Sequence, residues 1–472
     1  MIVYGALMPH PPIIVPEIGG ADLLEAQATV QGMRELAQEV CRHNPETLVF
    51  ITPHGNVFSD TLSLLCGQAV LKGDLGAFGH PEVRYQHPSD PEFERLLLKE
   101  ASANKVELVG ITEILARAHG LNPDLDHGIL VPLYYLEQAG LKKTKVVAIS
   151  IGFLSRERLY TFGTIIAKVA QSLGRRVAMI ASGDMSHRLK HKGPYSYHPD
   201  GQVFDLKVKE LLAQGDVKGV LELPSQLVEN AGECGYRSII VLMGALEGRS
   251  FSSLVFSYEG PFGVGYLVAG FIPGCSDQSR MFLSRLREDN RRQIESRRQQ
   301  ESPIVRWARE CLETYVRQGK KAELPPELPQ ELKKPAGAFV SLKKEGQLRG
   351  CIGTILPTQK NLALEIRENA VSAGTRDYRF SPVTEEELDE LVYSVDVLGQ
   401  PEAVSGRDQL DPKKYGVIVR CGGRTGVLLP DLEGVDTVDQ QISIALQKAG
   451  IRPDEPYQIE RFKVTKIGRA HV

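Results

Sequence analysis

Residues 2–12 read I-V-Y-G-A-L-M-P-H-P-P, an apolar run that stops at His10, which lies between prolines. The pattern returns at residues 47–55, T-L-V-F-I-T-P-H-G, where a second apolar run stops at His54. Short apolar runs bounded by proline and glycine are typical of buried strands, so each imidazole is expected at a strand end. Imidazole is the commonest protein ligand for transition metals. We therefore predict that His10 and His54 bind one metal ion.

The first 275 residues alternate between strand-like and helical patterns. Five further apolar runs predict strands at residues 61–67, 144–151, 176–182, 252–258 and 264–272. Helical patterns occupy residues 21–43, 90–104, 156–173, 201–214 and 235–248. This alternation predicts an α/β fold, a three-layer αβα domain with helices on both faces of a central sheet. The sheet is expected to be mixed, because the turn-like E-G-P-F-G joins the last two strands and makes them antiparallel.

The composition changes at residues 276–301, which contain many arginines and lack glycine and proline. We expect a basic, exposed helical linker there. A chain of 472 residues is long enough for two or three domains, and we place the first at residues 1–275 and a smaller α+β domain at residues 302–468. The second domain shows strand patterns at residues 337–342, 346–353, 393–397, 416–420 and 426–429, and helical patterns at 304–318, 360–373 and 437–449.

Charge and cysteine content narrow the classes of function. A formal net charge of −3 gives the chain no general attraction to nucleic acid or to an anionic membrane. No apolar stretch reaches the roughly 18 residues that span a bilayer. Seven cysteines without a C-x-x-C pair argue against a disulfide framework and a zinc ribbon. We therefore expect a cytoplasmic protein, and the helical linker leaves a homo-oligomer open.

Two more histidines have an acidic residue close by in the sequence. His127 follows Asp126 in L-D-H-G-I-L-V-P-L, and His187 comes three residues after Asp184 in S-G-D-M-S-H. A carboxylate beside a histidine often fixes its tautomer or raises its basicity. We predict that His187 is the general base, with Asp184 in the same catalytic group, and that His127 contacts an anionic substrate oxygen. The alternative is that Asp184 and His187 only cap the segment that follows.

Four motifs in this order, M-P-H-P-P, T-P-H-G, L-D-H-G-I-L-V-P-L and S-G-D-M-S-H, resemble the catalytic B subunit of class III (LigB-type) extradiol ring-cleavage dioxygenases. Memo proteins share that fold and a comparable set of histidines. The resemblance covers about residues 1–273 and implies that His10 and His54 are Fe(II) ligands. It makes His187 the acid or base and His127 a substrate-side residue. The implied substrate is a catechol- or aminophenol-like ring, with O₂ as co-substrate.

The resemblance leaves the third metal ligand open within V-E-N-A-G-E-C-G-Y-R-S, where Glu229, Glu233 and Cys234 all qualify. Memo proteins have a cysteine in a similar context, which favours Cys234, whereas the dioxygenases use a glutamate in this region, which favours Glu233. A carboxylate suits Fe(II) and oxygen activation. A thiolate shifts the preference toward Cu(I), Zn(II) or a differently tuned iron.

The most distinctive motif of the second domain is L-R-G-C-I-G at residues 348–353. Arg349 near Cys351 favours a thiol with a lowered pKa, although a small buried cysteine on a strand is the more frequent case. A second polar cluster, R-D-Y-R, begins with Arg376 and Asp377. It either binds an anion or pairs its own charges at the surface.

These motifs are similar to those of AMMECR-type domains over about residues 302–468. That resemblance implies a fold and a groove, without a known reaction; the groove residues are Arg349, Cys351, Arg376 and Asp377. The fusion with a LigB/Memo-like domain resembles the AmmeMemoRadiSam system, which implies a radical-SAM companion protein. The chain itself has no C-x-x-x-C-x-x-C iron–sulfur motif.

The sequence thus favours a non-haem Fe(II)-dependent oxidoreductase of the extradiol dioxygenase type. The alternative is a Memo-like metal-binding redox or modification component, which works with a radical-SAM partner and does not cleave rings. A third and least favoured hypothesis is a scaffold with an empty histidine site, in which the AMMECR-type domain is the interaction module.

Overall fold

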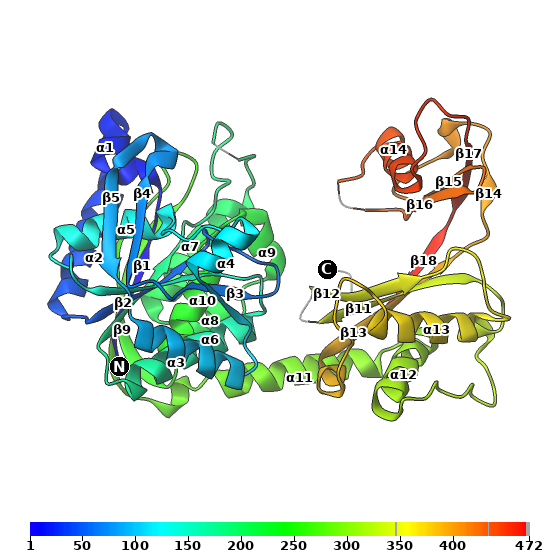
Figure 1. Ribbon diagram of the computed structural model, residues 1–472, viewed down its shortest axis with the longest axis horizontal. Coiled ribbons are helices and arrows are strands. Elements are labelled where there is room, and N and C mark those ends of the chain that lie inside the picture. The colour runs from blue at the N-terminus through cyan, green and yellow to red at the C-terminus, as the bar shows by residue number, and fades with distance from the viewer. Residues whose placement is uncertain (194, 345–346, 433, 469–472) are drawn as a thin grey trace. The chain divides into compact units, whose positions relative to one another are not determined.

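The computed structural model describes residues 1–193, 195–344, 347–432 and 434–468 (Figure 1). It divides into two compact units, Met1–Glu288 and Asp289–Val472. The division falls within helix α11 (Leu283–Gln299), in the segment for which the sequence predicts a basic helical linker. Gly346, with which one of the predicted strands begins, lies outside the described residues. None of the helices in the described ranges is long and apolar enough to cross a membrane.

The first unit is built on a mixed eight-stranded sheet. In sheet order its strands are β6 (Leu108–Ile111), β3 (Leu62–Leu65), β7 (Lys145–Ser150), β2 (Thr47–Thr52), β8 (Val177–Ser182), β1 (Ile2–Met8), β10 (Tyr266–Ser276) and β9 (Arg249–Glu259). The four central strands β7, β2, β8 and β1 are parallel, whereas the pairs β1–β10 and β10–β9 are antiparallel. Parallel strands are buried on both faces, which explains why the sequence marks them as continuous apolar runs.

Helices cover both faces of this sheet, because side chains alternate along each strand. In β2, Leu48 and Phe50 belong to the core on one face, whereas Val49 and Ile51 belong to the core on the other. The first core is covered by α2 (Gln27–Arg42) and α5 (His127–Gln138). The second is covered by α3 (Pro91–Ala103), α6 (Arg156–Ser172), α7 (Asp200–Gln214), α8 (Val217–Leu221) and α10 (Tyr236–Ala245). The predicted three-layer αβα fold with a mixed sheet is confirmed.

The remaining elements of this unit are short. They are α1 (Pro16–Gly19), α4 (Glu113–His119), α9 (Ser225–Ala231) and the two-stranded hairpin of β4 (Val70–Leu75) and β5 (His80–Pro88). The hairpin was not predicted, because its strands are polar and half exposed. Helix α5 was not predicted either. It begins at His127 behind the N-cap Asp126 and contains Pro132, a residue that usually ends a helix.

The parallel strands bring their carboxyl ends to one edge of the sheet. β8 lies between β1 and β2, with Ser182 opposite Met8 and Ala181 opposite Ile51. His10 and His54 each follow their strand by two residues, so they leave the sheet on the two sides of the same central strand. This edge positions the candidate site, as is usual for open α/β sheets.

The second unit contains two four-stranded antiparallel sheets. The first has the order β12 (Gln347–Gly353), β11 (Gly337–Lys344), β13 (Leu391–Leu398) and β18 (Val464–Ile467), and shares a core with α12 (Pro303–Gln318) and α13 (Leu362–Thr375). The second has the order β14 (Glu402–Ala403), β17 (Gln458–Phe462), β15 (Gly416–Cys421) and β16 (Arg424–Leu428), and shares a core with α14 (Val438–Ala449). The predicted α+β class of this smaller domain is confirmed.

Helix α10 packs against α6 through a contact that requires glycine on both helices. A Cβ atom on Gly163 of α6 would lie 2.0 Å from the carbonyl oxygen of Val241, and one on Gly244 of α10 would lie 2.1 Å from that of Tyr160. The two helix backbones are therefore in direct contact. This contact anchors α10, whose first turn follows the loop that carries Cys234.

We expect Gly244→Val to force α6 and α10 apart and to lower the free energy of unfolding by about 1–3 kcal/mol, the usual cost of overpacking. Urea unfolding followed by circular dichroism measures this change. Gln171→Val, at an exposed position of α6, is the matched control and should change the stability by less than about 0.5 kcal/mol. Equal stabilities of the two variants would contradict the close helix contact.

Candidate metal centre

His10 is the centre of the site and is almost fully buried. Its backbone N–H donates to Oδ1 of Asp184 (3.0 Å), and its ring Nδ1 lies 2.8 Å from the hydroxyl oxygen of Ser182. That hydroxyl donates its single hydrogen to the carbonyl oxygen of Gly128, so it accepts from His10 Nδ1–H. The hydrogen-bond network therefore assigns the tautomer of His10. It leaves the lone pair of Nε2 available to a metal ion.

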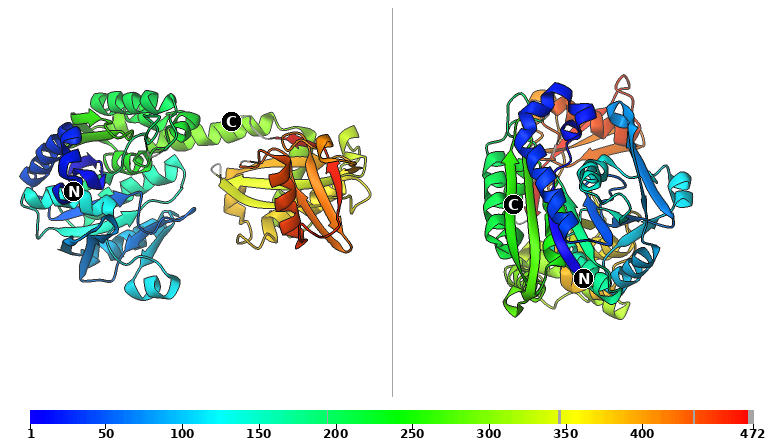
Figure 2. Two further views of the ribbon diagram at one scale, coloured as in Figure 1. Left: turned by 90° about the horizontal axis from the view of Figure 1, so that it is seen from above. Right: turned by 90° about the vertical axis from the view of Figure 1, so that its left-hand side faces the viewer.

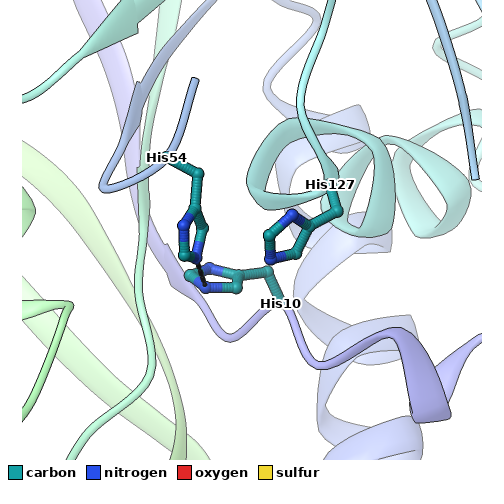
Figure 3. Close-up of side chains that lie close together, drawn as sticks. All are labelled: His10, His54 and His127. Atoms are coloured by element: carbon teal, nitrogen blue, oxygen red, sulfur yellow. Dashed lines mark hydrogen bonds between the residues drawn. The ribbon is translucent and has the colours of Figure 1, made fainter. Parts of the chain in front are cut away.

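His54 and His127 bring two more rings to this nitrogen (Figure 3). Nε2 of His54 lies 3.0 Å from Nε2 of His10, and the two rings meet edge-on with their centroids 4.8 Å apart. The centroid of the His127 ring lies 4.1 Å from that of His54 and 5.4 Å from that of His10. The three rings come from the loops after β1 and β2 and from the first turn of α5. The structure thus brings His10 and His54 within reach of one ion.

The thiol of Cys234 also faces His10. Its Sγ lies 3.8 Å from His10 Nε2 and accepts a hydrogen bond from the backbone N–H of Asp184 (3.2 Å). The two loops involved touch at a pair of glycines, because a Cβ atom on Gly183 would lie only 2.1 Å from Cα of Gly235. Glycine at both positions lets the S-G-D loop and the E-C-G-Y loop pass in contact.

Neither glutamate that the sequence offers as a third ligand faces His10. Glu229 is exposed on α9. Glu233 is buried, but one of its carboxylate oxygens accepts the backbone N–H of Tyr236 and the other lies 4.0 Å from Arg237. Its carboxylate therefore binds the first turn of α10. Asp184 is the carboxylate that lies beside His10.

Two sets of three described residues have ligand atoms within 4.8 Å of one another: His10, His54 and His127 form one set, and His10, Asp184 and Cys234 form the other. His10 is common to both sets. Imidazole nitrogen and thiolate sulfur are ligands that zinc, copper and iron accept. The donor atoms present, including the deprotonated Nε2 of His10, therefore fit a transition-metal ion.

Burial keeps the imidazoles neutral, which is the form that binds metal. Desolvation, with smaller effects of neighbouring histidines, holds the pKa of His10 well below its usual value. It also lowers the pKa of His54 and brings that of His127 to about 4. Desolvation raises the pKa of Asp184 to about 7 and that of the Cys234 thiol well above its usual range. A thiol that coordinates a metal ion nevertheless loses its proton.

His187 and His127 lie at the rim of this centre, each against an exposed aromatic ring. The His187 ring stacks on Tyr195 with centroids 5.0 Å apart, and His127 meets Phe78 edge-on at 5.2 Å. Desolvation, followed by the effect of His54, lowers the pKa of His187 to about 4. Among the described residues, His187 is in neither set of ligand atoms.

Residues of L-R-G-C-I-G form hydrogen bonds and an ion pair with other residues of the second unit. Arg349 makes a two-fold ion pair with Glu387, with N–O distances of 3.0 and 2.9 Å, and also donates to the carbonyl oxygen of Ser381. Burial alone would raise the pKa of Glu387, but the hydrogen bonds from Arg349 lower it to about 2. Cys351 is half-buried and accepts a hydrogen bond from the hydroxyl of Ser341 (3.2 Å).

Asp377 forms an ion pair with Arg379, the last residue of the same R-D-Y-R cluster. Its carboxylate accepts the backbone N–H of Cys351 (2.9 Å) and binds Arg379, whose hydrogen bond is the main cause that lowers the pKa of Asp377 to about 2. Arg379 in turn donates to the carbonyl oxygen of Cys351. The pair thus occupies both backbone groups of Cys351 on the edge strand β12. Arg376 is exposed at the end of α13.

Sequence reasoning missed three residues of the metal centre and its rim. Ser182 ends β8 and fixes the tautomer of His10, and a polar residue at the end of an apolar run was the available signal. Phe78 lies in the unpredicted hairpin, and Tyr195 lies in the loop after His187. No pattern in the sequence joins these two rings to the histidines that they contact.

Comparison with known proteins identifies the first unit. The family model of the catalytic LigB subunit of aromatic ring-opening dioxygenase matches residues 4–269. The chain belongs to this family. The AMMECR1 family model matches residues 305–467, so the predicted fusion of a LigB/Memo-like domain with an AMMECR-type domain is confirmed. LigB-type domains are metal-dependent, and the LigB domain of this chain contains a possible metal site of histidine, aspartate and cysteine.

Relatives of the LigB–AMMECR1 chain cover the whole fusion or a part of it. A Clostridium acetobutylicum protein is 41% identical over 463 residues and is matched over 98% of each chain. A Thermotoga maritima protein is 56% identical over 169 residues, which are 35% of this chain and 97% of that protein. The crystal structure of an uncharacterized Pyrococcus horikoshii protein matches 34% of this chain and 88% of its own, with 32% identity and a TM-score of 0.33.

We expect Ser182→Ala to weaken metal binding by the LigB domain about 10–100-fold, because the ring of His10 loses the acceptor that fixes its tautomer. Competition against a chromophoric chelator measures the affinity for Zn²⁺ or Co²⁺. Ser150→Ala, which changes a buried serine at the end of the neighbouring strand β7, is the matched control and should keep the wild-type affinity. If Ser182→Ala also keeps it, the assignment of the His10 tautomer is wrong.

Proposed function

We propose that the LigB domain binds one transition-metal ion through His10, His54 and Cys234 and acts as a metal-dependent oxidoreductase on a small molecule. The observation that carries the proposal is the unprotonated Nε2 of His10, which faces His54 Nε2 at 3.0 Å and Cys234 Sγ at 3.8 Å. His54 and Cys234 approach this nitrogen from separate loops, one in each of the two sets of ligand atoms that share His10. Such convergence of buried, neutral imidazoles with a thiol is typical of a metal centre.

The choice of Cys234 over Glu233 follows from where each side chain is bound. The carboxylate of Glu233 receives the N–H of Tyr236, so turning it toward His10 would leave that donor without its partner. The thiol of Cys234 already faces His10, and no hydrogen bond has to be broken to turn it there. Two imidazoles and one thiolate suit Cu(I), Zn(II) or iron, and a redox-active iron or copper ion would supply electron transfer between the substrate and an oxidant such as O₂.

His127 and His187 support this chemistry as proton-handling groups at the rim. Because desolvation keeps both rings neutral, with pKa values of about 4, each ring holds one N–H donor and one free lone pair. An anionic substrate beside them raises these pKa values, since a nearby negative charge favours the imidazolium form. Each ring is then suited to take a proton from the substrate that binds next to it.

A second candidate function is extradiol ring cleavage with Fe(II) and O₂. Two observations favour it: the LigB family match and the carboxylate of Asp184, which lies in one set of ligand atoms with His10. In this function Asp184 takes the place of a ligating glutamate, and the substrate is a catechol- or aminophenol-like ring. The fusion with the AMMECR1 domain supports the further proposal of a radical-SAM companion protein.

The metal-centre proposal and the ring-cleavage candidate differ in the role that they give to Cys234. We expect Cys234→Ala to lower the affinity for Zn²⁺ or Co²⁺ at least about tenfold, because one of three ligands is lost. In the wild-type protein, Co²⁺ should give a sulfur-to-metal charge-transfer band in the near ultraviolet, and the variant should lack it. Dialysis against metal, followed by metal analysis and absorption spectroscopy, measures both effects.

Glu233→Gln is the matched control for this experiment, because it alters the adjacent residue and keeps a side chain that can accept the N–H of Tyr236. It should retain the metal stoichiometry and the charge-transfer band. Loss of metal with Glu233→Gln, together with full binding by Cys234→Ala, would refute the proposed ligand set.

Ring cleavage makes a separate prediction. If Asp184 completes an Fe(II) site, protein loaded with iron under anaerobic conditions should consume O₂ when a catechol is added, and Asp184→Asn should abolish this uptake because the carboxylate is lost. An oxygen electrode and a panel of catechols and aminophenols measure it. Metal analysis of the variant shows whether iron is still bound. No uptake with any member of the panel would eliminate ring cleavage and leave the metal-centre proposal intact.

A further inference from the structure

The strands at the two edges of the eight-stranded sheet differ strongly in length. At one edge β6 has four residues, whereas at the other β9 has eleven. β9 pairs with β10 on its inner side, and no strand of the described ranges pairs with its outer side. Figure 2 shows β9 and β10 as two long green strands that lie side by side. A long edge strand presents a row of backbone donors and acceptors that another strand can pair with.

The side chains of β9 do little to prevent such pairing, although the strand has one β-bulge, at Phe256. Between its two ends, residues 250–258 read S-F-S-S-L-V-F-S-Y, without a charge or a proline, although charges and prolines are the usual means of blocking an edge. Leu254, in the middle, is 56% exposed. The edge strand β12 of the second unit is different, because Asp377 and Arg379 occupy the backbone groups of Cys351 there.

The ends of β9 carry opposite charges. Arg249 donates to the carbonyl oxygen of Gly274, and Glu259 accepts from the backbone and the hydroxyl of Thr29. In the part of the chain that the structure describes, neither residue has an ion-pair partner. Arg249 and Glu259 lie at the two ends of β9, on either side of Leu254, and a β-bulge at Phe256 makes the glutamate side one ladder position shorter. Antiparallel pairing of β9 with an identical strand about Leu254 therefore brings the arginine end of each strand beside the glutamate end of the other.

We propose that a second copy of this chain pairs with the first along β9, antiparallel and about a two-fold axis near Leu254. The partner is an identical chain because the strand is complementary to itself in charge and in its uncharged centre, which is the property of a two-fold interface. The two eight-stranded sheets then become one continuous sheet. Helix α7, which contacts β9 through the hydrogen bond from Tyr258 to Asp205, adds the exposed side chains of Val203 and Leu206.

This interface leaves the metal centre open. β10 separates β9 from β1, and His10, His54 and Cys234 all lie in loops outside β9. Pairing through β9 is therefore compatible with either ligand set, and its test does not depend on metal or on activity.

Sedimentation velocity of the full chain tests the proposal. We expect the wild-type protein to have twice the 52.1 kDa of one chain, and Leu254→Lys to raise the dimer dissociation constant at least about 100-fold, because two lysines then face each other across the axis. Leu24→Lys is the matched control, since Leu24 is 69% exposed on another part of the unit. It should remain a dimer.

Hydrogen exchange provides the second measurement and does not require a variant. The outward-facing amides of β9 should exchange more slowly as the concentration of the wild-type protein rises, because pairing protects them. A monomeric wild-type protein, a dimer that Leu254→Lys leaves intact, or β9 amides that exchange at the same rate at every concentration would each overturn the proposal. Leu206→Lys, on α7, should weaken the dimer in the same direction.

Discussion

Because β8 pairs in parallel with β1 on one side and with β2 on the other, the ends of three strands meet at one edge of the sheet. His10 and His54 leave the sheet on either side of β8. Ser182, at the end of β8, accepts a hydrogen bond from the ring of His10. If any of these strands ran in the opposite direction, its histidine or serine would lie at the far edge. The geometry of the metal centre is therefore a consequence of strand order.

Burial alone does not bring every group of this centre into the protonation state that binds metal. Desolvation favours neutral imidazoles, a protonated thiol and a protonated Asp184. Only the imidazoles are then in the state that binds metal. A divalent ion changes the balance, since it favours the thiolate and the carboxylate while it needs the imidazoles neutral. Metal binding at this edge of the sheet is therefore coupled to the release of protons.

The sequence was most informative where physical constraints are local. Apolar runs followed by Pro-His located β1, β2 and their two histidines, and the family resemblance added the order of the motifs. The sequence did not reveal α5, because Pro132 interrupts the helical pattern. It also did not decide between Glu233 and Cys234 as the third ligand. That distinction depends on which way each side chain turns from adjacent positions, and the turn is set by the first residues of α10.

The contact between Gly183 and Gly235 has a consequence for how the site takes up an ion. With the backbones of the two loops already touching, the loop that carries Cys234 is held against the loop that carries Asp184, whose carboxylate accepts the backbone N–H of His10. The part of the ordering cost that positions Cys234 is therefore met during folding rather than when an ion binds. A larger side chain at either glycine would push Cys234 away from His10 and weaken the site without touching a ligand.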